Sequence, residues 1–78
     1  MLKINFSILG KNIKKIEKRY EELKTQLDRD LVNDFKITYR VEDDVFNVKL
    51  VIKDDDFKRV RSILNKNKIK FKTPLKGI

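Results

Sequence analysis

Three consecutive aspartates, Asp54, Asp55 and Asp56, are the residues of this sequence that come nearest to a reactive site. Grouped carboxylates are the ligands that Mg²⁺ prefers, so a metal site is one interpretation. The aspartates also stand directly before an amphipathic segment that begins at Phe57. Aspartate is favoured at the start of a helix, because it caps free backbone N–H groups and complements the helix dipole. We therefore interpret the cluster as a helix start and expect no metal site.

Other groups that could do chemistry are scarce. The chain has no cysteine and no histidine, which removes the thiolate nucleophile, the commonest metal ligand and the commonest general base. Ser7 and Ser62 have no histidine to activate them. The two glycines, Gly10 and Gly77, do not form a glycine-rich phosphate loop. The sequence predicts a binding protein without enzymatic activity or cofactor.

The elements that position the remaining polar residues follow from the spacing of the apolar ones. Strict alternation of apolar and polar residues predicts strands with one buried face, and residues 13–31 repeat apolar positions every three or four residues, as an amphipathic helix does. A second helix is expected after the aspartates, with apolar positions from Phe57 to Leu64. The alternating segments are 2–8, 35–41, 46–52 and, more briefly, 69–72.

The predicted order of elements is β-α-β-β-α-β, which is the ferredoxin-like arrangement of the α+β class. This arrangement is a four-stranded antiparallel sheet with two helices on one face, because right-handed crossovers place both helices on the same side. We expect a single domain over 1–72 and a tail over 73–78. No apolar run approaches the ~18 residues of a membrane span and no signal peptide is recognised, so we expect a cytoplasmic protein.

The basic residues are concentrated on the predicted open face of the sheet. The chain carries a net charge of +8 and a pI near 9.8, a composition typical of nucleic-acid-binding domains. Eight basic residues and one acidic residue, Glu42, fall on the face that the apolar positions leave open, a difference of +7. The eight are Lys3, Lys36, Arg40, Lys49, Lys53, Lys68, Lys70 and Lys72.

Three explanations of this basic face remain open. Lysines on edge strands discourage sheets from pairing, and a lysine-rich composition adds to their number, but Lys3 and Lys49 belong to strands predicted to be central. The face could instead bind an acidic protein surface, as a small inhibitor or regulator from a phage or mobile element would. Our leading hypothesis is nucleic acid, held with low specificity through its phosphates. Asn5, Thr38 and Asn47 would add hydrogen bonds.

Two further expectations concern partners. No aromatic residue points out of the predicted open face, so bases should not stack there, and no helix combines a basic face with an exposed aromatic one, so a membrane partner is not expected. Two strongly basic faces would repel each other. We therefore expect a weak homodimer through the edge of strand 35–41 or through Leu75 and Ile78 of the tail.

Overall fold

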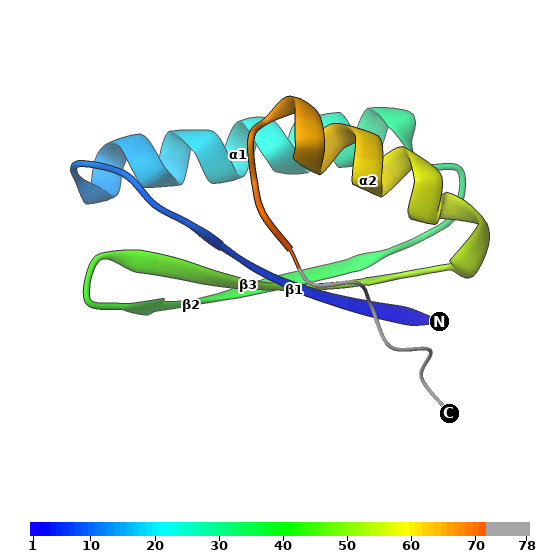
Figure 1. Ribbon diagram of the computed structural model, residues 1–78, viewed down its shortest axis with the longest axis horizontal. Coiled ribbons are helices and arrows are strands. Elements are labelled where there is room, and N and C mark those ends of the chain that lie inside the picture. The colour runs from blue at the N-terminus through cyan, green and yellow to red at the C-terminus, as the bar shows by residue number, and fades with distance from the viewer. Residues whose placement is uncertain (72–78) are drawn as a thin grey trace.

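A computed structural model of the protein describes residues 1–71. The chain forms two layers, a three-stranded antiparallel sheet in the order β1-β3-β2 and two helices that lie on the same side of it (Figure 1). The predicted α+β class, with both helices on one face, is confirmed. The elements are β1 (Leu2–Ile8), α1 (Ile13–Asp30), β2 (Lys36–Glu42), β3 (Val45–Ile52), the 3-10 helix η1 (Asp54–Asp56) and α2 (Phe57–Lys66).

The core lies between the helices and one face of the sheet. Every second residue of β1 from Leu2 to Ile8 is buried, and so is every second residue of β3 from Phe46 to Ile52. The helices meet these residues with an apolar stripe at helical spacing, as the sequence predicts. The buried residues of the stripe are Ile16, Tyr20, Leu23 and Leu27 of α1 and Val60, Ile63 and Leu64 of α2.

The turn between β2 and β3 sets the register of this hairpin. Asp43 and Asp44 both have positive φ, at 50° and 61°, which is the backbone of a two-residue type I′ turn. Aspartate tolerates this conformation better than most residues, which is why two aspartates can form the turn. The turn places Glu42 opposite Val45 and Lys36 opposite Val51.

The predicted last strand is represented in the structure by a single antiparallel bridge between Phe71 and Phe6 of β1. Ile69 is buried in the core, so the chain does return to the sheet after α2. Within residues 1–71 the sheet nevertheless has three strands rather than the expected four. Lys72 and the tail 73–78, with Leu75 and Ile78, lie outside the described residues.

The expected position of Lys68 on the open face is wrong, because Lys68 belongs to the end of α2. Its φ is 59°, its N–H donates to the Asn65 carbonyl, and the Ile69 N–H donates to the Leu64 carbonyl at 2.9 Å. This pair of bonds is a Schellman motif, which satisfies carbonyls left free at a helix end. The motif is usually built with glycine, so a lysine at this position gave no sequence signal.

Candidate functional site

Two of the three aspartates, Asp55 and Asp56, tie two loops together. Asp56 is only 1% exposed and accepts hydrogen bonds from the backbone N–H groups of Val32 and Asn33, at 3.2 and 3.0 Å. The side-chain amide of Asn33 donates to both Asp55 and Asp56. The aspartates do stand at the start of α2, but the expectation that they cap it is wrong, because no aspartate side chain makes a capping bond there.

The partners of Asp56 keep its carboxylate ionised. Burial raises the pKa of the Asp56 carboxyl, but the hydrogen bonds from Asn33 and Val32 and the charge of Arg59 outweigh this effect and hold the pKa below its usual value. Arg59 lies 3.6 Å from the carboxylate. Within residues 1–71 no three acidic, histidine or cysteine side chains are grouped as a metal site would require. Asp55 and Asp56 thus anchor the loop at Val32 and Asn33, and Asp54 forms an ion pair with the N-terminal amine at 3.3 Å.

The open face of the sheet, by contrast, presents polar side chains in register. Its outward residues form three rows that cross the sheet from β1 through β3 to β2. Neighbours in a row are separated by one strand spacing of about 5 Å, and the two ends of a row by about 10 Å. The rows are Lys3, Val51 and Lys36; Asn5, Lys49 and Thr38; and Ser7, Asn47 and Arg40.

The cations of these rows are available to a ligand. Lys3, Lys36 and Lys49 are exposed, and none of them forms an ion pair within the described part of the chain. Arg40 pairs with Glu42 at 3.1 Å, where both side chains are largely exposed. Glu42, the only acidic residue of β1, β2 and β3, is therefore already paired. The positive electrostatic potential of the open face comes from the three lysines.

The uncharged polar residues stand between the cations. The Ser7 hydroxyl donates to the Asn47 Oδ1 at 2.8 Å, which leaves the amide NH₂ of Asn47 free to donate to a ligand. Asn5 and Thr38 flank Lys49 in the central row. Ser7 was not among the predicted site residues, although the alternation of β1 points it outward. Val51, half-buried between Lys3 and Lys36, is an apolar residue of the face.

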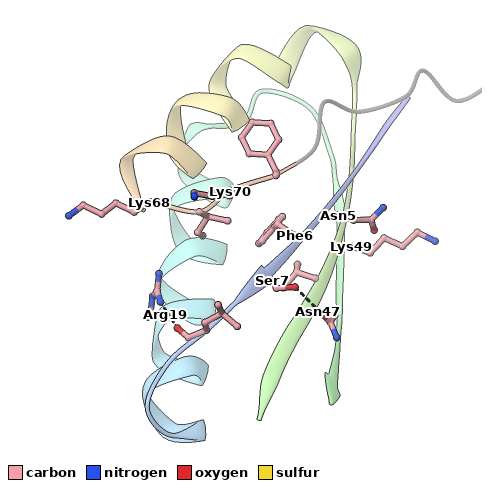
Figure 2. Close-up of a pocket in the computed structure, with 12 residues that line it drawn as sticks. Asn5, Phe6, Ser7, Arg19, Asn47, Lys49, Lys68 and Lys70 are labelled. Carbon is pink, nitrogen blue, oxygen red and sulfur yellow. Dashed lines mark hydrogen bonds between the residues drawn. The ribbon is translucent and has the colours of Figure 1, made fainter. Parts of the chain in front are cut away.

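A groove of about 940 Å³ runs along the free edge of β1. Asn5 and Lys49 lie on its open-face side, and Arg19 and Lys68 lie on the side of the helices (Figure 2). The Arg19 guanidinium donates to the Leu9 carbonyl at 2.6 Å, so it holds the loop after β1 in place. Phe71 closes part of this edge through its bridge to β1. The groove thus continues the basic face around the edge of the sheet.

The structure brings most of the predicted site together. Lys53 is exposed immediately after β3, and Lys70 is exposed beside β1 between Ile69 and Phe71. Lys68 lies apart from the face, and Lys72 is outside the described residues. The predicted residues that share the open face are Lys3, Asn5, Lys36, Thr38, Arg40, Asn47 and Lys49.

In comparisons with protein-family models, with curated proteins and with solved structures, nothing matches this chain. Neither helix in residues 1–71 is long and apolar enough to cross a membrane.

Proposed function

We propose that this domain binds nucleic acid through phosphate contacts on the open face of its sheet, without catalysing a reaction. The observation that carries the proposal is the group of three lysines, Lys3, Lys36 and Lys49, that share one face and form no ion pair in the described chain. Lysines held in this way gain free energy by displacing the counterions that surround a nucleic-acid backbone.

The composition of the face favours phosphates over bases. Its outward residues on β1, β2 and β3 include no aromatic ring, so single-stranded bases have no platform on which to stack. Asn5, Thr38 and Asn47 supply hydrogen-bond donors between the lysines, and donors of this kind bind phosphate and sugar oxygens. We therefore expect low sequence specificity.

We also propose that the segment beginning at Ile69 completes the sheet as a fourth strand beside β1. This strand would give the ferredoxin-like order, and it would place Lys70 next to Ser7. The antiparallel bridge between Phe6 and Phe71 and the burial of Ile69 support it. A fourth strand would extend the basic face across the free edge of β1.

The salt dependence of binding tests the main proposal. Titrating fluorescent duplex DNA with the protein between roughly 50 and 200 mM salt should give a linear plot of log affinity against log salt, with a slope of about −0.9 per phosphate contact. We expect about four to six contacts, which corresponds to a slope of about −4 to −5. An affinity that does not change with salt would falsify phosphate binding.

A pull-down from lysate separates nucleic acid from an acidic protein partner. Nuclease treatment should release all bound material if the face binds nucleic acid. Retention of one acidic protein in stoichiometric amount after nuclease treatment would support a small inhibitor or regulator instead, because an acidic protein surface complements the same lysines.

A further inference from the structure

Strand β2 is the least covered strand of the sheet. The helices bury Phe46 and Leu50 of β3 completely, but they leave Tyr39 and Val41 of β2 51% and 46% exposed on the same side. The outer edge of β2 pairs with no described strand. An exposed strand edge beside exposed apolar side chains is a template for pairing with another strand.

The ring of Tyr39 is held in one orientation. It stacks on Phe46 with ring centroids 4.6 Å apart and planes 2° from parallel, and Tyr20 of α1 lies 4.7 Å away. These contacts cover part of the ring, while about half of the Tyr39 side chain stays exposed. Tyr39 is also the central residue of β2, which runs from Lys36 to Glu42.

The sequence of β2 is complementary to itself when two copies run antiparallel about Tyr39. The strand reads KITYRVE, so Lys36 falls opposite Glu42 of the second copy at both ends of the pairing. Ile37 falls opposite Val41, Thr38 opposite Arg40, and Tyr39 opposite Tyr39. Direct cross-strand partners share a face, so the ion pairs lie on the open face and the apolar pairs lie on the helix side.

Neighbouring registers of the same strand pair are less favourable. A shift of one residue would turn the apolar side chains of one copy to the open face of the other. A shift of two residues places Lys36 opposite Arg40 in one direction, and Arg40 opposite itself in the other. Like charges directly opposite each other are destabilising. The register about Tyr39 pairs every residue of β2 and contains no such contact.

We propose that a second copy of this chain pairs with β2 in this register, forming a symmetric dimer with one continuous sheet. Such a twofold interface uses the same surface on both copies. The carboxylate of Glu42 accepts more than one hydrogen bond, so its pair with Arg40 of its own chain is compatible with Lys36 of the second copy. The dimer does not depend on nucleic-acid binding. It joins the two open faces side by side, with Lys36 engaged by Glu42 of the second copy and with Lys3 and Lys49 of both copies still without an ion pair in the described chain.

Two charge reversals test the register. Lys36→Glu places a second carboxylate opposite Glu42 at both ends of a homodimer, and Glu42→Lys places a second ammonium group opposite Lys36. Within one chain these residues stand at opposite ends of β2, about 20 Å apart, so they do not contact each other. Any rescue between the two reversals must therefore occur between copies.

The strength of dimerisation, measured by sedimentation equilibrium, should depend on the charges at positions 36 and 42. Each single variant should dimerise about tenfold more weakly than the wild type, since both symmetric pairs become repulsive. An equimolar mixture of the two variants should recover the wild-type association, because each end of the mixed dimer places a carboxylate of one copy opposite an ammonium group of the other. The double variant Lys36→Glu with Glu42→Lys should recover the wild-type association as well, because it restores opposite charges at both ends.

Lys49→Glu is the matched control. It makes the same charge change as Lys36→Glu, but on β3, away from the edge, and it should not weaken the dimer. Circular dichroism of each variant should match that of the wild type, since all three substituted positions are exposed. A monomeric wild type at millimolar concentration would overturn the dimer. Single variants that associate like the wild type, or a double variant that fails to recover, would overturn the register.

Discussion

The two faces of the sheet are built from alternate residues of the same strands, yet they differ in nearly every property. On β3, Phe46, Val48 and Leu50 are buried beneath the helices, whereas Asn47 and Lys49 are exposed between them. Burial of the apolar residues fixes the direction of their neighbours, because side chains alternate along a strand. The core therefore determines which lysines are displayed together, without any contact between those lysines.

The largest expected effect is on stability, and it differs between adjacent residues of β3 that lie on opposite faces of the sheet. Leu50 is fully buried, and Leu50→Ala should lower the free energy of unfolding by about 2–5 kcal/mol, because it removes apolar contacts and leaves a cavity. Lys49→Ala should change that free energy by less than about 0.5 kcal/mol. Urea denaturation measures both, and an equal loss at the two positions would contradict the division into a structural face and a displayed face.

The second effect concerns Asp56, the only polar side chain buried among the described residues. Asp56→Asn should lower the free energy of unfolding near pH 7 by about 2 kcal/mol, since the bonds that it weakens are made to a charged group. The pKa of this carboxyl is lower in the folded chain than its usual value. Its contribution is therefore fully present above the unfolded pKa of about 3.9 and is lost as the pH falls through the folded pKa.

Acid titration of stability checks this assignment. The wild type should lose stability below about pH 4 more steeply than Asp56→Asn does. Asp55→Asn is the control, because Asp55 is exposed and its carboxylate accepts a hydrogen bond only from the side-chain amide of Asn33. Parallel pH curves for the wild type and Asp56→Asn would show that the carboxylate does not anchor the loop.

Substitutions at Lys68 test whether the nucleic-acid-binding surface ends at the open face of the sheet. Because Lys68 adopts a left-handed backbone at the end of α2, Lys68→Gly should raise the free energy of unfolding by about 1 kcal/mol. Ser62→Gly, in the middle of the same helix, should lower it by about 0.5 kcal/mol. Lys68→Gly should also reduce nucleic-acid affinity less than Lys49→Gly does, as Lys68 is not on the open face. A greater loss at Lys68 would move the binding surface to the helix side.

Features that depend on neighbouring residues could be predicted from the sequence, and features that depend on contacts between distant residues could not. Alternation alone predicted the buried faces of β1 and β3, and hence the shared face of Lys3 and Lys49, because both follow from strand geometry. The same alternation misled at Lys68, where a helix end and a strand look alike if no glycine marks the left-handed residue. The role of Asp56 depends on a contact with Asn33, which lies 23 positions away in the sequence and has no local signal.

The most direct test of the proposed function compares two charge reversals that alter the net charge equally. Lys3→Glu with Lys49→Glu changes the open face, and Lys14→Glu with Lys15→Glu changes the first turn of α1, in the helix layer. Acidic residues are favourable in a first turn, so the second pair should fold at least as well as the wild type. Both pairs lower the net charge from +8 by the same amount.

Affinity for duplex DNA, measured across a salt series, distinguishes the two pairs. The open-face pair should lose about 100-fold or more in affinity, and its salt slope should fall in magnitude by about 2, because each phosphate-binding lysine contributes about one to the slope. The helix pair should keep the wild-type slope and an affinity within several-fold of the wild type. Equal losses of affinity and slope in both pairs would show that net charge alone, rather than the open face, binds the nucleic acid.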